Sequence, residues 1–202
     1  MINHHMSLEI SAPYIKIPNS SSINSRKLNT ESSGILFVKR GVKMIWSGEE
    51  VAKWISAGVA SKQIRVQPNG VDLTVSEIYA FGSEGKLYEE QREMPRYEKL
   101  EGIEWLLTSG VYLVRYGEWI KIPPNAIGLV LPRSSLLRMG ATIYTAVWDS
   151  GYEGRGIGLL HVMNPHGIKL KKGARIAQII FISARSEKLY EGIWKGEGKE
   201  SH

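Results

Sequence analysis

The sequence has 202 residues, 43% of them hydrophobic, which predicts one compact domain with a substantial core. It contains no cysteine, which excludes disulfide bonds, thiolate zinc sites and a cysteine nucleophile, and its five histidines lack the spacing of metal ligands. The net charge of +6 is spread along the chain, so it fits a small polyanionic ligand as well as nucleic acid. No apolar run approaches the roughly 18 residues of a membrane span and no signal peptide is evident, so we expect a cytoplasmic protein without a membrane partner.

Residues 1–43 are polar and aperiodic, rich in Ser and Asn, and we expect a poorly ordered N-terminal extension there. The stretch "SGEEVAKWISAG" predicts one short helix. Ser47 and Glu50 have capping-box spacing, and Val51 and Trp54 belong to one apolar stripe. We expect Trp54, like Trp46 before it, to lie in the core.

From Ile64 onward the chain is a series of short β-branched and aromatic segments separated by Gly, Pro and Asn turns. This pattern predicts a mostly β domain, a distorted barrel or jelly roll, over residues 44–189. Strands do not alternate with helices, which argues against a Rossmann or P-loop protein. The charged stretch at 84–102 is typical of an exposed loop or arm.

Four segments combine small, polar and charged residues in places where a plain core would be apolar. They are "QPNGVDL" (67–73), "LPRSSLLRMG" (131–140), "VWDSGYEGRG" (147–156) and "GARIAQ" (173–178). In the second, the hydroxyls of Ser134 and Ser135 between Arg133 and Arg138 could cradle phosphate oxygens, although a plain turn has the same composition. Asp72 in the first is by default a turn aspartate, unless a metal–phosphate complex needs a carboxylate.

Together with the Gly-rich "YEGIWKGEGK" (190–199), the "VDL", "PRSSL", "DSGYEG" and "GARIAQ" stretches resemble, in order and spacing, the five motifs of the trimeric dUTPase and dCTP deaminase superfamily, in its archaeal dUTPase form. The resemblance implies a β-clip jelly-roll subunit, a homotrimer with active sites at subunit boundaries, and a deoxynucleoside triphosphate bound with Mg²⁺. Asp72 would serve the metal through water. Arg133, Ser134, Ser135, Arg138 and Gln178 would bind the phosphates.

One position separates the two chemistries of that superfamily. The deaminases place a glutamate ten residues after the third-motif aspartate, and counting from Asp149 leads to Leu159, which cannot transfer a proton. We therefore expect a dUTP diphosphatase in which water attacks the α-phosphorus, Asp149 accepts the proton, and dUMP and pyrophosphate leave. The alternatives are a dCTP deaminase, a bifunctional dCTP deaminase/dUTPase, or a basic β-barrel that binds nucleic acid without catalysis; we expect no nucleic-acid partner.

The remaining assignments also follow from the resemblance. Tyr152 would pack beneath the deoxyribose and reject a 2′-hydroxyl, although it could equally be a core tyrosine. Residues 190–202 would form a flexible lid in which Trp194, Lys195 and Lys199 contact the base and phosphates, and a tail without a role is the alternative. We expect backbone groups of 145–147 and 157–160 to read uracil, and Arg175 to be a structural ion-pair partner, with a phosphate ligand as the alternative.

Overall fold

The computed structural model describes residues 44–60 and 62–199. The expectation for residues 1–43 lies outside the described residues, as does the part of the predicted lid beyond residue 199. No described helix is long and apolar enough to cross a membrane.

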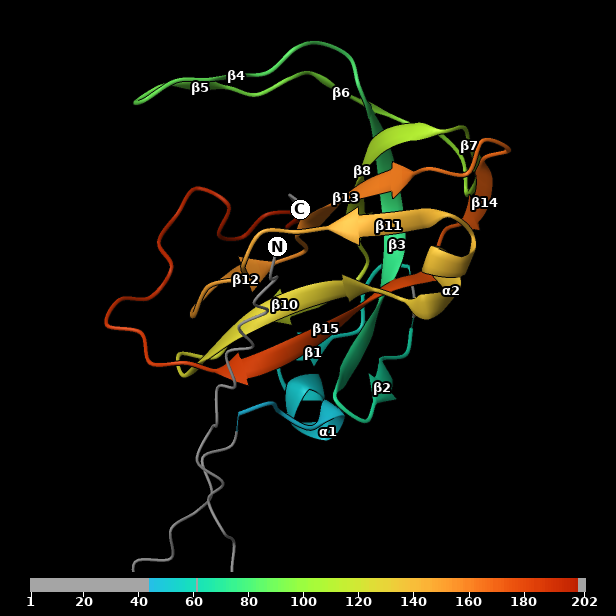
Figure 1. Ribbon diagram of the computed structural model, residues 1–202. Coiled ribbons are helices and arrows are strands. Elements are labelled where there is room, and N and C mark those ends of the chain that lie inside the picture. The colour runs from blue at the N-terminus through green and yellow to red at the C-terminus, as the bar shows by residue number, and fades with distance from the viewer. Residues whose placement is uncertain (1–43, 61, 200–202) are drawn as a thin grey trace, which may run out of the picture. The chain divides into compact units, whose positions relative to one another are not determined.

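The described chain is mostly β, as the segment pattern predicts (Figure 1). The elements are α1 (Gly48–Ala52), β1 (Ile55–Ser56), β2 (Arg65–Gln67), β3 (Gly70–Phe81), β4 (Lys86–Leu87), β5 (Arg92–Glu93), β6 (Tyr97–Lys99), β7 (Glu104–Leu107), β8 (Gly110–Tyr116), β9 (Trp119–Lys121), β10 (Ala126–Pro132), α2 (Ser134–Arg138), β11 (Ala141–Tyr144), β12 (Glu153–Gly154), β13 (Ile157–Val162), β14 (Ile168–Lys171) and β15 (Arg175–Ser183).

The largest sheet has the order β10-β15-β3-β8-β13-β11, and β2 and β6 pair with opposite ends of β3. Its two edge strands, β10 and β11, approach each other, and the hydroxyl of Thr145 just after β11 donates to the carbonyl of Val130 in β10. The sheet therefore curls into a nearly closed barrel. The smaller sheet β1-β9-β12 lies beside it and carries the turn that follows Trp148.

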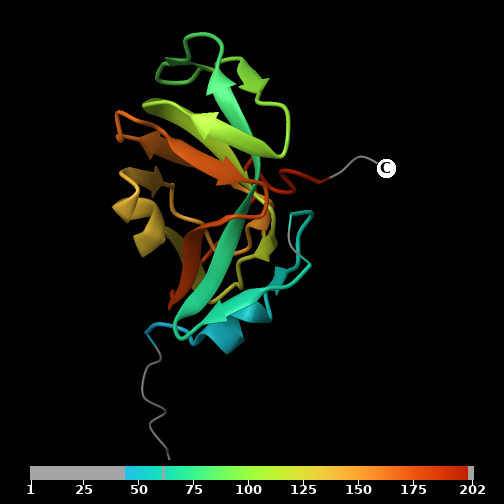
Figure 2. The same cartoon turned by 90° about the vertical axis from the view of Figure 1, so that its right-hand side faces the viewer.

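Strand β3 runs the length of the barrel (Figure 2), and its first part, residues 70–76, is buried on both faces. One face is apolar: Val71, Leu73 and Val75 are fully buried in the core. The other face is polar and equally buried, with Asp72, Thr74 and Ser76. A buried polar group is costly unless it has a hydrogen-bond partner, so this face must be matched by groups from neighbouring segments.

The partners of Thr74 and Ser76 come from β8, which pairs with β3, and from the turn after β8. Thr74 donates to the carboxylate of Glu118 through its amide (2.9 Å) and through its hydroxyl (2.8 Å). Ser76 donates to the carbonyl oxygens of Arg115 and Tyr116. Burial raises the pKa of Glu118, and the two bonds from Thr74 oppose that shift. These contacts hold β3 where its pairing shifts register, and thereby fix the position of Asp72.

Helix α1 begins at the predicted capping box, in which the Ser47 hydroxyl and the Glu50 carboxylate bond reciprocally to the backbone. Trp46 is buried and Trp54 packs against the core, as expected. The sequence predicted one helix, but the structure has a second short helix, α2, directly after β10. Pro132 ends that strand and Arg133 has the extended backbone of an N-cap, so "PRSSL" is a strand-to-helix turn.

The charged stretch predicted as an arm contains the β4–β5 hairpin, which projects from the barrel (Figure 1). Leu87 at its tip is 85% exposed. Met94, immediately after β5, lines the cavity described next.

Candidate functional site

A cavity of about 460 Å³ opens beside the turn that carries Asp149. This volume lies in the range of small-molecule sites. Its wall is built from β11 and the segment after it, from the start of β13, from the third-motif turn and from the C-terminal tail. The lining residues are Met94, Leu113, Tyr144, Thr145, Ala146, Val147, Trp148, Asp149, Tyr152, Gly156, Ile157, Gly158, Leu159, Tyr190, Trp194 and Glu197.

Three aromatic rings make the floor of this cavity. Trp148 packs edge-on against Tyr152 with ring centroids 5.1 Å apart, and Tyr152 packs against Tyr190 at 5.7 Å. A side chain at Gly156 would collide with the Trp148 ring, so glycine is required for this packing. Burial raises the pKa of Tyr152 above the ordinary tyrosine value. Tyr152 is both a core residue and a cavity floor, so the two interpretations of its role are compatible.

Asp149 lies at the cavity wall with an exposed side chain. The turn is fixed on both sides of it: Trp148 exchanges two backbone hydrogen bonds with Gly128 of β10, and the Tyr152 amide donates to the Asp149 carbonyl. Gly151 has a φ of +84°, which other residues adopt only with strain. Within residues 44–60 and 62–199 the Asp149 carboxylate has no hydrogen-bond or ion-pair partner, unlike Glu153, which binds Trp119 and Lys121. A positioned and unpaired carboxylate is suited to accept a proton.

The segments expected to read the base meet across this cavity. Residues 145–147 form one side and Ile157, Gly158 and Leu159 form the other. Leu159 pairs with Tyr144 and with Leu113, so the position that carries the glutamate in the deaminase motif is apolar here. Gly158 is needed because any side chain would collide with the buried hydroxyl of Tyr116.

The tail folds back on the same chain and closes one side of the cavity. The Tyr190 amide donates to the Ser150 carbonyl, the Gly196 amide to the Glu153 carbonyl, and the Arg155 amide to the Glu197 carbonyl (2.8 Å). Trp194 and Glu197 line the cavity, and Trp194 is 40% exposed. The Lys195 ammonium instead donates a hydrogen bond to the Tyr190 carbonyl.

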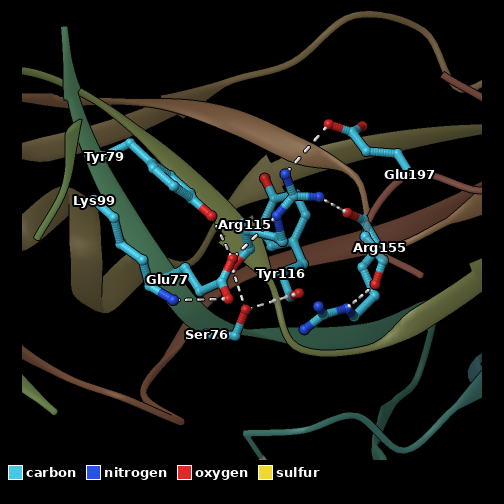
Figure 3. Close-up of polar contacts among 9 residues, drawn as sticks. Ser76, Glu77, Tyr79, Lys99, Arg115, Tyr116, Arg155 and Glu197 are labelled. Atoms are coloured by element: carbon cyan, nitrogen blue, oxygen red, sulfur yellow. Dashed lines mark hydrogen bonds and ion pairs between the residues drawn. The ribbon is translucent and has the colours of Figure 1, made fainter. Parts of the chain in front are cut away.

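Glu197 belongs to a charged network that crosses three strands (Figure 3). Its carboxylate lies 3.6 Å from Nη2 of Arg115, and Nε of Arg115 lies 3.2 Å from Glu77, which also binds Lys99 and Tyr79. Burial raises the pKa of Glu197, and the charge of Arg115 only partly offsets this. The sequence offered no signal for this role, because Glu197 stands between two glycines in a stretch without periodicity.

A second cluster of predicted site residues surrounds Asp72. Its carboxylate is fully buried and accepts from Nη1 of Arg133, from Nη1 of Arg175 (3.0 Å) and from Nε2 of Gln67 (3.0 Å). Gln178 lies opposite Asp72 in the β15–β3 pair. The Arg175 ion pair agrees with the structural role expected for it. Ser134, Ser135 and Arg138 are exposed on α2 immediately after Arg133.

The two clusters lie apart within one chain. Trp148, next to Asp149, pairs with Gly128 of β10. Arg133 lies five residues beyond Gly128, just past the end of β10, and five residues of extended strand span about 16 Å. Neither Arg133 nor Gln178 lines the Asp149 cavity, and no Lys, Arg or His of the described residues lines it. Lys199 lines a different cavity. The structure thus unites Asp149, Tyr152 and Trp194, and separately Asp72, Arg133 and Gln178.

Comparison with known proteins agrees with the motif resemblance. The dCTP deaminase-like family model matches residues 45–184. A probable deoxyuridine 5′-triphosphate nucleotidohydrolase of Aeropyrum pernix is 44% identical over 137 residues, which are 66% of this chain and 86% of the relative. The deoxyuridine 5′-triphosphate nucleotidohydrolase of Methanocaldococcus jannaschii is 48% identical over 65% of this chain and 88% of the relative.

The fold is similar to that of a solved 2′-deoxycytidine 5′-triphosphate deaminase from Agrobacterium tumefaciens. That comparison has a TM-score of 0.54 and 18% identity, and covers 70% of this chain and 48% of the deaminase chain. The chain therefore belongs to the dCTP deaminase-like family, beside the archaeal deoxyuridine 5′-triphosphate nucleotidohydrolases.

Proposed function

We propose that this protein is a dUTP diphosphatase that hydrolyses dUTP to dUMP and pyrophosphate. The observation that carries the proposal is the Asp149 cavity, with an unpaired carboxylate on its wall and Leu159 in place of a proton-transferring side chain. The archaeal relatives named as deoxyuridine 5′-triphosphate nucleotidohydrolases support the same substrate.

In the proposed reaction the oxygen of a water molecule attacks the α-phosphorus of dUTP. Asp149 accepts the proton of that water, the bond from the α-phosphorus to the bridging oxygen breaks, and that oxygen leaves with pyrophosphate. A positioned base contributes about 10²–10⁴ to such a rate. Tyr152 supports the deoxyribose from below, and backbone groups of 145–147 and 157–159 face the base.

We further propose that a complete site needs two subunits of a homotrimer. In the part of the chain that the structure describes, no Lys, Arg or His lines the Asp149 cavity, yet a triphosphate requires positive charge and hydrogen-bond donors. Arg133, Ser134, Ser135, Arg138 and Gln178 supply these groups, but in one chain they lie around the far end of β10, on α2 and β15, away from this cavity. A neighbouring copy that presents its α2 end to this cavity would complete the site.

Magnesium is proposed as a companion of the substrate phosphates. Asp72 does not fit a direct magnesium ligand, because its carboxylate is buried and occupied by two guanidinium groups; its water-mediated role stays a prediction. Among the residues described, no group of three His, Asp or Glu side chains could hold a metal. Mg²⁺ would neutralise phosphate charge. The Asp72 carboxylate itself holds the guanidinium groups of Arg133 and Arg175.

A dCTP deaminase is the competing function, because the cavity holds a second carboxylate. Burial raises the pKa of Glu197, as proton transfer at C4 of cytosine would require. However, Glu197 is engaged with Arg115 and sits on the tail rather than on the strand that carries Leu159. We therefore favour diphosphate release.

The test is to incubate purified protein and Mg²⁺ with dUTP, dCTP, UTP or dTTP and to measure pyrophosphate and ammonia separately. We expect pyrophosphate from dUTP, loss of turnover in Asp149→Asn, and little loss in Glu153→Gln, a carboxylate of the same turn that does not line the cavity. Comparable ammonia release from dCTP would overturn the assignment, and binding of oligonucleotides without turnover would favour the non-enzymatic alternative.

A further inference from the structure

A second cavity, of about 510 Å³, borders the end of the tail. Residues 57–59, which follow β1, form one wall, and Gly117 and Trp119 from the β8–β9 turn form another. Arg155, Gly198 and Lys199 complete it. None of these residues lines the Asp149 cavity, and the proposed reaction uses none of them in that cavity.

Arg155 is the unusual residue of this second cavity, because it is a buried cation without a counter-ion among residues 44–60 and 62–199. Only 7% of it is exposed. Its Nε donates to the Gly198 carbonyl (2.9 Å) and its own carbonyl accepts from Arg115, but its buried Nη1 has no acceptor among the described groups. No carboxylate of the described chain forms an ion pair with it, and Figure 3 shows its guanidinium directed away from Glu197. Such a group is costly to bury unless an anion compensates it.

The chemistry of the remaining wall narrows the class of anion. Among the described residues, the charged side chains of the lining are those of Arg155 and Lys199, both cations, and none of the lining residues is acidic. The rest is apolar or glycine, with Ala57 and Val59 beside the indole of Trp119, whose Nε1 is held by Glu153 (2.9 Å). Two cations beside an aromatic, apolar wall match a dianionic head group attached to a flat or apolar body.

We propose that this cavity binds an organic phosphate monoester. Near neutral pH a phosphate monoester carries almost two negative charges, which equals the charge of Arg155 and Lys199 together. Its oxygens accept from the guanidinium and the ammonium, and its organic group packs against Trp119 and Val59. Because Gly198 and Lys199 belong to the tail, an occupied site also holds the tail against Arg155.

Isothermal titration calorimetry with phenyl phosphate tests the proposal, with inorganic phosphate and phenol as the two half-ligands. We expect phenyl phosphate to bind at least about tenfold more tightly than either half, because neither satisfies both walls. Arg155→Gln should weaken binding about tenfold or more, and Lys199→Gln by less. Val59→Trp, at an exposed position, should block the cavity without touching Arg155. Arg92→Gln and Lys169→Gln remove charges elsewhere on the surface and should leave affinity unchanged.

Three results would overturn the site. The first is no measurable binding of phenyl phosphate to the full chain. The second is equal affinity for phenyl phosphate in Val59→Trp and wild type. This comparison remains available if Arg155→Gln fails to fold. The third is binding that is lost in Arg133→Gln but kept in Arg155→Gln, since the ligand would then occupy the phosphate cluster of the proposed active site.

Discussion

Replacing Asp72 by Asn separates an anchoring role from a metal role at this position. The side chains have nearly the same shape, so the change removes mainly the charge. In the folded protein that charge is shared by Arg133, Arg175 and Gln67. Without this charge, the guanidinium groups of Arg133 and Arg175 share at most one neutral acceptor. Arg133 then loses the ion pair that orients its side chain.

The expected cost follows from the burial of each partner. Breaking a buried ion pair costs about 3–5 kcal/mol, and an exposed pair about 0–1 kcal/mol. The Asp72 carboxylate is 1% exposed, but the Arg133 side chain is 24% and the Arg175 side chain 46% exposed, so solvent screens both. We expect a loss of about 2–4 kcal/mol in the free energy of unfolding, or roughly 5–15 °C in melting temperature for a domain of this size.

Thermal unfolding of Asp72→Asn beside Arg175→Gln measures this directly. The arginine variant removes only the more exposed partner and should cost about 1 kcal/mol or less. Steady-state kinetics with dUTP should show a raised KM for Asp72→Asn, because Arg133, the proposed phosphate ligand, loses the ion pair that orients it. A melting temperature within 1–2 °C of wild type, together with a kcat rescued by excess Mg²⁺, would refute the anchoring argument and favour a metal role.

Three further changes test other parts of the structure. Truncation after Tyr190 should lower kcat more than it changes KM, with little effect on melting, because the tail closes the cavity whereas the barrel ends at Ser183; unchanged kcat would reject the lid. Hydrogen exchange at residues 194–197 measures docking of the tail, which should be strongest in acid. Docking should weaken as the pH rises from the usual glutamate pKa of about 4.3 through the raised pKa of Glu197. The groups that face Glu197 are Arg115, Tyr97 and Tyr152. Glu197→Gln should abolish that dependence. Leu159→Glu should release no ammonia from dCTP and should destabilise the fold, since it places an unpaired carboxylate between Tyr144 and Leu113; efficient deamination would show that one residue separates the two chemistries.

Local chemistry explains why much of the fold could be predicted. The capping box of Ser47 and Glu50 and the β-branched segments each act over a few residues, so their elements appear where the pattern places them. Helix α2 was harder, because five residues cannot display a helical period, and "PRSSL" suits a turn equally well. The short strands β1 and β12 depend on pairing with β9, which no local pattern encodes.

The candidate-site residues that stand in a sequence motif could be predicted. The residues whose properties arise from burial by distant segments could not. Asp149 and Tyr152 stand in one turn, so they reach one cavity together. The role of Asp72 depends on Arg133 and Arg175, which are 61 and 103 residues away in the chain. Glu197 and Arg155 have unusual environments only because the tail covers them, and this long-range contact leaves no trace in the residues on either side.

Strand β10 connects the two halves of the proposed site mechanically. One end of it holds the Asp149 turn through the paired backbone of Gly128 and Trp148, and the other end is followed by Arg133, whose guanidinium is held by Asp72. Seven residue pairs join β10 to β15, so the strand cannot slide without breaking a continuous ladder. In the proposed trimer each subunit would offer the Asp149 end to one site and the Arg133 end to another. A substitution that shifts the register of β10, such as an insertion after Val130, should therefore impair both the base and the phosphate contacts, in two different sites.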